Sequence, residues 1–298
     1  MNKKRNYRRT LSIRSALIAF ALLSVILGIW TSRSIQQRNA VATVQRLGGI
    51  VKYNDSETWQ IAKAFANWLG PDFVYVAVKV DLSKSNVSDD DLQYVSRLPS
   101  IRVLSLSGTN VTGTGFTGLL GLKNLITLKL NNTQVTNDSL REVAQLKSLA
   151  NLGLNGAEKI DNDGIHFLSD CKNLVSINLW NTATGDKGLE TLSALPKLRS
   201  IVAGNTKISD NGTKCLRHSK TLETIVLQRT TIGDETLVHL SQIPTLRKLV
   251  VSQTNITDSG LEFLTRGTVL AELSISNTNV SPQGKANLKI RLPNTEIR

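Results

Sequence analysis

Two cysteines and three histidines are the side chains of this 298-residue chain best suited to nucleophilic or metal chemistry. Cys215 and His218 stand three positions apart, which puts a nucleophile and a base on one helical turn. No glycine-rich oxyanion element accompanies them, and His166 and His239 lack metal-ligand spacing. Cys171 and Cys215 form no CxxC motif, which favours buried thiols. The sequence therefore predicts no enzyme, no cofactor and no metal site.

Asparagine and threonine form a second group that suggests chemistry, here glycosylation. The segment NNTQVTNDSL contains two sequons, which begin at Asn131 and Asn137. The same polar texture recurs in SGTNVTGTGF, GNTKISDNGT, QRTTIGDETL, SQTNITDSGL and SNTNVSPQGK. Such recurrence favours a structural repeat that places Asn and Thr near each strand exit, rather than a modification signal.

The repeat has a strict period of 24 residues. One apolar position recurs at every step, with a single step of 25 residues in the segment NGAEKID: it is Leu104, Leu128, Leu152, Ile177, Ile201, Ile225, Leu249 and Leu273. A period of 20–29 residues with L-x-x-L-x-L character is the signature of a leucine-rich repeat. The segment VAVKVDLSKSNVSDDDLQYV fits as an earlier, degenerate unit, so nine repeats are expected over residues 74–290.

Each unit should contain one short strand and one helical segment. In L-x-x-L-x-L the last two apolar positions alternate at period 2, whereas the apolar residues after the turn return at helical spacing, as at Leu189, Leu192 and Leu195. Neither element buries its apolar side alone, so the units must stack. The fold class expected is α/β: a solenoid with parallel strands on the concave face and helices on the convex face.

Two polar series accompany the repeat. The first stands where the chain leaves each strand, and its hydroxyls are expected to bond backbone groups of neighbouring coils; it runs Ser85, Thr109, Thr133, Thr182, Thr206, Thr230, Thr254 and Thr278. The second is expected to cap the helices at their N-termini and comprises Asp186, Asp210, Asp234 and Asp258.

The net charge of +13 is concentrated at the N-terminus. Residues 1–46 contain nine Lys and Arg and no Asp or Glu, which weakens the case for a nucleic-acid-binding body. Residues 15–32 carry no charge and, as a helix, span about 27 Å, close to a bilayer's ~30 Å core. The basic run from Lys3 to Arg14 should remain cytoplasmic, and Trp30 suits the outer headgroup region. An uncleaved signal anchor is favoured; a cleaved signal peptide and a buried core helix are the alternatives.

Residues 47–73 are expected to cap the first coil. A helix should begin near Asp55 or Ser56 and end at Gly70-Pro71. Its apolar face comprises Trp59, Ala62, Phe65 and Leu69. A packing cap is favoured here over an aromatic ligand pocket.

The outward positions of the strands are the surface best suited to recognition. They are mostly small and polar, and Trp180 is their one large aromatic residue. Trp180 is either an interface anchor or a shield packed over Gly153 and Gly204. The candidate partner-binding residues are Trp180, Asn178, Lys129, Asn131, Asn155, Gln228 and Lys248.

The motif T-x-[IV]-[TS]-D-x-G-L-x-x-L resembles the cysteine-containing subclass of leucine-rich repeats and its GALA-like bacterial relatives. The whole layout, with the basic start, the single span, RLGGIVKY and the terminal LPNTEIR, is similar to membrane-anchored leucine-rich repeat proteins of planctomycete bacteria. The resemblance implies the fold and the topology, and little biochemistry.

Together these features predict a membrane-anchored module that displays an extracytoplasmic, periplasmic or cell-surface recognition surface for a protein or cell-envelope partner, and no nucleic acid. A structural envelope spacer without a specific ligand is the alternative. The expected parts are a basic tail (1–14), a transmembrane signal anchor (15–32), a juxtamembrane stalk (33–46), an N-terminal cap (47–73), nine repeats (74–290) and a C-terminal cap strand (291–298).

Overall fold

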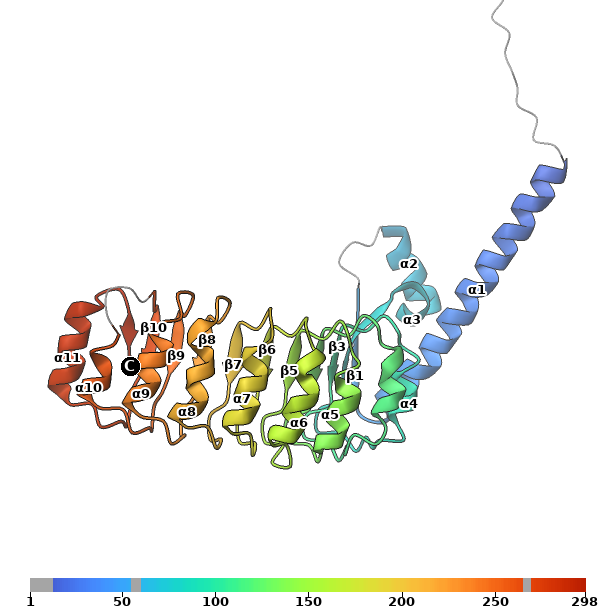
Figure 1. Ribbon diagram of the computed structural model, residues 1–298. Coiled ribbons are helices and arrows are strands. Elements are labelled where there is room, and N and C mark those ends of the chain that lie inside the picture. Colours follow the sequence, from blue (N-terminus) through green and yellow to red (C-terminus); the bar gives the residue numbers. More distant parts are fainter. Residues whose placement is uncertain (1–12, 55–59, 265–268) are drawn as a thin grey trace, which may run out of the picture.

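The computed structural model describes residues 13–54, 60–264 and 269–298, with the backbone alone for residues 60–63. The body is an elongated solenoid from whose N-terminal end one long helix projects (Figure 1). The prediction of an α/β solenoid preceded by one long apolar helix is confirmed. The first residues, the start of the expected cap helix and Trp59 lie outside the described residues.

A single sheet of short strands runs the length of the solenoid in sequence order. Neighbouring strands are parallel and in register, except that β1 pairs antiparallel with β2 at the N-terminal edge. The strands are β1 (Ile50–Tyr53), β2 (Ala77–Asp81), β3 (Val103–Ser105), β4 (Thr127–Lys129), β5 (Asn151–Gly153), β6 (Ser176–Asn178), β7 (Ser200–Val202), β8 (Thr224–Val226), β9 (Lys248–Val250), β10 (Glu272–Ser274) and β11 (Glu296–Ile297).

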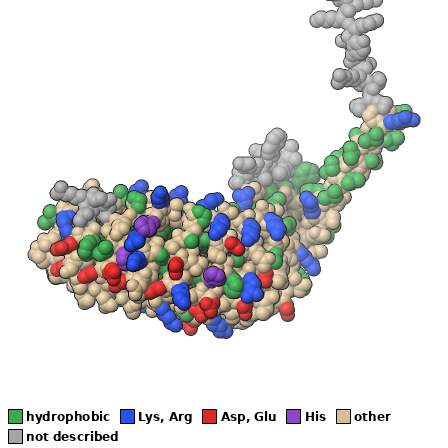
Figure 2. Space-filling view, viewed as in Figure 1, with side chains coloured by type: hydrophobic (Ala, Val, Ile, Leu, Met, Phe, Trp, Pro, Cys, Tyr) green, Lys and Arg blue, Asp and Glu red, His purple; other side chains and the backbone are tan. Residues whose placement is uncertain are grey.

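A helical segment follows each strand from β2 to β10 and lies on the opposite side of the sheet from the outward strand positions (Figure 1). These segments are α4 (Leu92–Val95), η1 (Phe116–Gly121), α5 (Asn137–Val143), α6 (Asn162–Phe167), η2 (Leu168–Asp170), α7 (Asp186–Ser193), α8 (Asp210–Thr213), η3 (Lys214–His218), α9 (Asp234–Leu240), α10 (Asp258–Leu261) and α11 (Pro282–Arg291). Figure 2 shows acidic and basic side chains interspersed over this helix face.

One continuous apolar core fills the space between strands and helices. It extends from Val41 near the N-terminal end to Leu292 near the C-terminal end, and most of its members are fully buried leucine, isoleucine and valine. Each fully buried side chain of this size contributes about 1.5–3 kcal/mol to folding. Phe116 is the one aromatic residue among the largest fully buried side chains described.

The hydroxyl series works within single coils, which differs from the expectation. Thr133 donates to the carbonyl of Leu130 at 2.7 Å and Thr230 to that of Leu227 at 2.6 Å, and both acceptors lie three residues earlier in the same coil. The coil-to-coil bond at this level comes from the preceding backbone amide, as when Asn132 N donates to Asn155 O at 2.6 Å. The hydroxyl therefore fixes the turn, and the backbone joins the coils.

The N-terminal end is formed by α1 (Ile13–Arg46), β1, α2 (Gln60–Leu69) and α3 (Pro71–Val74). No residue from Ile13 to Arg33 is buried, whereas Ser34, Ala40, Val41 and Val44 are. The segment expected as a juxtamembrane stalk, residues 33–46, is the second half of the same helix, and it packs against the first coil. The physical reason is its apolar stripe, which covers core that the first coil would otherwise expose.

Candidate functional site

The outward positions of the strands, called the strand face here, form straight rows because the strands are in register. One row comprises Lys129, Gly153, Asn178, Val202, Val226 and Val250, each paired directly with the next. Strands lie about 4.8 Å apart, so side chains separated by several repeats in sequence become immediate neighbours. The row changes from polar to apolar along the solenoid.

Trp180 is placed by the turn that follows β6. Its backbone N–H donates to Asn178 Oδ1 at 3.0 Å, which fixes where the chain leaves the strand. Its indole lies directly over Gly204 in the next coil, since a Cβ built on Gly204 would be 2.2 Å from the ring atom Cζ3. The packing reading is therefore correct for Gly204. Trp180 as a whole is nevertheless only half-buried, so part of it remains accessible to solvent.

Asn131 and Asn155 belong to a ladder between coils. Asn131 Oδ1 accepts the backbone N–H of Asn155 at 3.0 Å, and its amide nitrogen donates to Ser107 Oγ at 3.4 Å. These bonds occupy the side chain of Asn131, which lies against Gly153. Asn131 therefore stabilises the stack and is a poor candidate for partner contact.

The remaining predicted residues differ in how free their side chains are. Lys248 pairs with Glu272 at 2.7 Å, and Gln228 donates to Gln253 at 3.4 Å. Lys129 is exposed and enters no ion pair with a described residue. The charge of Lys248 is thus offset within the solenoid, whereas that of Lys129 faces solvent.

Three valines extend this surface beyond the predicted residues. Val202, Val226 and Val250 are adjacent in one row, and all three are half-buried on the strand face. Trp180 lies over Gly204, two residues along the chain from Val202. A large ring and a row of aliphatic side chains on one face have the composition of an interface core. The signal was present in the sequence, because valine in the outward positions of three successive repeats departs from the polar pattern.

The aspartate series was expected to cap its own helices, but it does not. Asp186, Asp234 and Asp258 are the first residues of α7, α9 and α10. Each carboxylate accepts instead from the coil that follows; Asp186 Oδ1, for example, accepts Ser209 N at 2.8 Å while its Oδ2 accepts Ser209 Oγ at 2.6 Å. The series is therefore a structural ladder between coils.

The sequon residue Asn137 belongs to the same ladder. Its side chain exchanges two hydrogen bonds with Asp161, donating to Oδ1 at 2.7 Å and accepting the backbone N–H at 3.1 Å. Ser139, the third residue of that sequon, is buried. The repeat reading of NNTQVTNDSL is thus supported by the contacts of its own side chains.

Cys215 and His218 lie on the helix face but are each engaged elsewhere. Cys215 Sγ donates to the Gly212 carbonyl at 3.0 Å, and His218 Nε2 accepts from Arg217 Nε at 2.9 Å. Burial raises the pKa of the Cys215 thiol above its ordinary value. Burial likewise raises the pKa of Cys171, to about 11. Both shifts disfavour the thiolate that nucleophilic catalysis needs.

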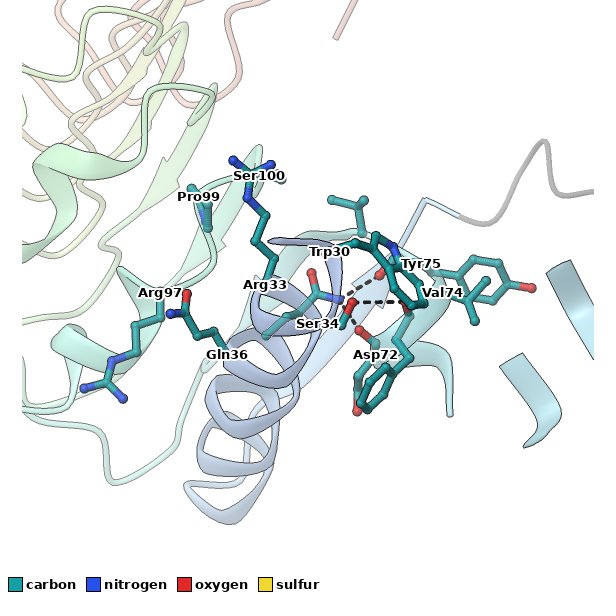
Figure 3. Close-up of a pocket in the computed structure, with 13 residues that line it drawn as sticks. Trp30, Arg33, Ser34, Gln36, Asp72, Val74, Tyr75, Arg97, Pro99 and Ser100 are labelled. Carbon is teal, nitrogen blue, oxygen red and sulfur yellow. Dashed lines mark hydrogen bonds between the residues drawn. The ribbon is translucent and has the colours of Figure 1, made fainter. Parts of the chain in front are cut away.

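The junction between α1 and the first coil contains a cleft of about 490 Å³ (Figure 3). Gln37 lines this cleft and donates to the carbonyls of Asp72 and Tyr75, both at 2.7 Å. Arg33 and Arg97 line the same cleft. Within the part of the chain that the structure describes, no group of three His, Cys, Asp or Glu residues is arranged to hold a metal ion.

Comparisons with known proteins agree on the fold alone. No protein-family model and no curated protein matches the sequence. Among solved structures, internalin C2 from Listeria monocytogenes is similar with a TM-score of 0.52 and 21% identity, over 72% of this chain and 82% of that one. The plant peptide hormone receptor RGFR1 in complex with RGF2 gives a TM-score of 0.45 and 18% identity, over 73% and 42% of the two chains.

A third structure, of a leucine-rich repeat protein from Leptospira interrogans, gives a TM-score of 0.45 and 19% identity, over 69% of this chain and 62% of that one. The internalin likeness agrees with the repeat period of 24 residues and the single ladder of short parallel strands. This chain therefore has the leucine-rich repeat fold.

Proposed function

We propose that this chain is a membrane-anchored leucine-rich repeat protein that binds a protein or cell-envelope partner through its strand face, outside the cytoplasm. The observation that carries the proposal is the apolar row Val202, Val226 and Val250 on the same face as the half-buried Trp180. A row of this kind is costly to leave in water, and a partner that covered it would gain apolar contact. Lys129 and Gln228 would then lie at the polar rim.

The length of α1 supports the anchor. Its projecting part, Ile13 to Arg33, rises about 31 Å as a helix, which matches a hydrocarbon core of ~30 Å. Apolar side chains cover this part (Figure 2), and it contains the 18-residue window apolar enough to cross a membrane. The helix continues without a break from this part into Ser34 and Val41, which are buried, so the span leads directly into the folded body.

The basic residues before the span favour a cytoplasmic N-terminus, since positively charged flanks remain on that side. The solenoid would then lie in the periplasm or at the cell surface. Digestion of intact spheroplasts with a protease tests this orientation. We expect the repeats to be degraded from outside, and the mature chain to have the mass of all 298 residues. Protected repeats would refute the orientation, and a mass lacking residues 1–32 would refute the anchor.

Site-specific photo-crosslinking tests the binding face. A benzophenone amino acid at Val226 should join the protein to the same partner in repeated preparations, because Val226 is the centre of the apolar row. The matched control carries the same amino acid at Lys187, which is exposed on the helix face. Equal products from both positions, or none from either, would refute the binding face and favour a structural spacer.

A further inference from the structure

The short helix α2 presents large apolar side chains to solvent. Trp68 is 79% exposed and Phe65 is 50% exposed, while the small Ala66 is buried. Phe65 and Trp68 are three residues apart and therefore lie on one side of the helix. A helix that belonged only to a cap would turn these rings inward, so the outward side requires another apolar environment.

The boundary of the proposed membrane lies close to this helix. The projecting part of α1 ends at Arg33, and Ser34 is the first buried residue. Trp30, which suits the headgroup region, is therefore within a few residues of the folded body. No free spacer separates the span from the solenoid, so the N-terminal end of the solenoid must lie at the bilayer surface.

Direct bonds hold α3, the neighbour of α2, to this boundary. Ser34 Oγ donates to the Phe73 carbonyl at 3.3 Å, and Gln37 donates to the carbonyls of Asp72 and Tyr75. Tyr53 of β1 also donates to the Asp72 carboxylate. Burial and this hydrogen bond raise the pKa of Tyr53 above its ordinary value. The position of α3 is thus fixed within one turn of the end of the span.

The chain then places α2 beside the membrane. Helix α2 ends at Leu69, and only Gly70 separates it from α3 at Pro71. In Figure 1 α2 lies on the side of the solenoid from which α1 projects, and α3 contacts both helices. Trp68 is consequently only a few residues from α3, which bonds to α1 at the boundary.

Basic groups accompany the aromatic side chains at this level. Arg33 and Arg97 are exposed at the cleft in Figure 3, together with Trp30. Neither arginine forms an ion pair with a described residue. Guanidinium groups are strong donors to phosphate oxygens. Trp30 and two arginines without an acidic partner among the described residues lie at one cleft, where the membrane-crossing helix meets the folded body, and they match the chemistry of a phospholipid headgroup layer.

We propose that α2 is an interfacial helix that inserts Phe65 and Trp68 into the outer surface of the bilayer that α1 crosses. This inference rests on the proposed membrane anchoring. With α1 it gives the solenoid two membrane contacts, which hold the solenoid in one orientation relative to the membrane. The lipid surface is favoured over a protein partner because α2 packs on α3, which is bonded to α1 where the span ends.

Tryptophan quenching in nanodiscs tests the inference on the full-length chain. The variant Trp30→Phe, Trp59→Phe, Trp180→Phe leaves Trp68 as its only tryptophan. Matched variants retain Trp30 alone or Trp180 alone. Each is reconstituted in phosphatidylcholine nanodiscs, with or without phosphatidylglycerol, that contain lipids brominated near the headgroup or near the chain end. Circular dichroism verifies that each variant is folded.

We expect the Trp68 fluorescence to be lost with bromine near the headgroup and retained with bromine near the chain end. Trp30 should also be quenched, and Trp180 should not. A quenched Trp30 with an unquenched Trp68 would overturn the interfacial helix alone. Acrylamide, a water-soluble quencher, then shows whether Trp68 is open to water or covered by protein, and either result contradicts insertion. An unquenched Trp30 would overturn the anchoring itself, and with it the proposed function.

Phosphatidylglycerol tests the arginines in the same samples. Replacing Arg33 and Arg97 with Gln should remove any gain in Trp68 quenching that the anionic lipid causes. Persistence of that gain in the double variant would show that the arginines do not bind the anionic lipid. The membrane contact of α2 would then depend on the two aromatic rings alone.

Discussion

The carboxylate of Asp186 occupies the space that a side chain on Gly212 would need. Asp186 Oδ1 accepts the backbone N–H of Ser209 at 2.8 Å, and a Cβ built on Gly212 would lie 2.3 Å from that oxygen. The same relationship recurs between Asp234 and Gly260. The glycine of the D-x-G motif thus makes room for the aspartate of the preceding coil, and this contact explains why the two residues recur together.

Substitution of Gly212 should therefore disturb two coils at once. We expect Gly212→Ala to lower the free energy of unfolding by about 1–3 kcal/mol, the usual cost of overpacking, because the carboxylate must move and lose its backbone bond. Denaturant titration measures this change. Gly121→Ala is the control, since nothing lies within 4 Å of a Cβ at that position. Equal effects of the two variants would contradict the steric explanation.

Substitution of Lys84 by glycine should stabilise the folded protein. Its backbone φ is 60°, the left-handed region that side chains with a Cβ disfavour, and its own side chain is exposed. We expect Lys84→Gly to raise the free energy of unfolding by about 1 kcal/mol. Lys123→Gly is the comparison, since Lys123 lies outside this region. That variant should have an unchanged or lower free energy of unfolding. Destabilisation by Lys84→Gly would contradict the argument.

Acid should destabilise the solenoid through its hydrogen-bonded carboxylates. Burial raises the pKa of Asp89, but hydrogen bonds from Thr112, Gly115 and Gly113 outweigh it and hold the pKa below its ordinary value of 3.8. A carboxyl group whose pKa is lower in the folded protein stabilises the folded state at pH values above its pKa in the unfolded chain. This contribution is lost as the pH falls through the pKa of the folded state. The free energy of unfolding should be constant near neutral pH and decrease below about pH 4.

Asp89→Asn should flatten this decrease and lower the stability at neutral pH, because the amide is a weaker acceptor than the carboxylate. Asp138→Asn is the control at neutral pH. Asp138 has a side chain that is 91% exposed and a contact of 3.9 Å to Arg141, so its loss should change the unfolding free energy little. An unchanged acid slope in Asp89→Asn would refute the assignment to Asp89.

Removal of the indole should weaken partner binding without unfolding the protein. Trp180→Ala is expected to cost at least about 2 kcal/mol of binding free energy, a loss of roughly 30-fold in affinity. Titration of the purified protein with the partner identified by crosslinking measures this loss of affinity. Gly204→Ala should weaken binding as well, since a Cβ there displaces the ring, and Lys187→Ala should not. Full affinity in Trp180→Ala would exclude the ring from the binding face.

Much of the architecture was predictable because the repeat is local and periodic. Leu128 and its equivalents recur every 24 residues, and stacking is the only way for such units to bury their apolar sides. The N-terminal end was less predictable. Strand β1 and the buried side of Val44 depend on contact with the first coil, and Phe65, expected to face the core, is half exposed. A single amphipathic helix does not reveal in its sequence which apolar environment its apolar side meets.

The candidate site divides in the same way. The sequence by itself determined which strand positions face outward, including Asn178 and Val226, because alternation within a strand is a local property. Only the tertiary structure decided that Asn131 Oδ1 accepts the backbone N–H of Asn155 and that Lys248 is paired with Glu272. It also placed the ring of Trp180 over Gly204. These contacts join residues about 24 positions apart, and their geometry exists only once the coils are stacked in register.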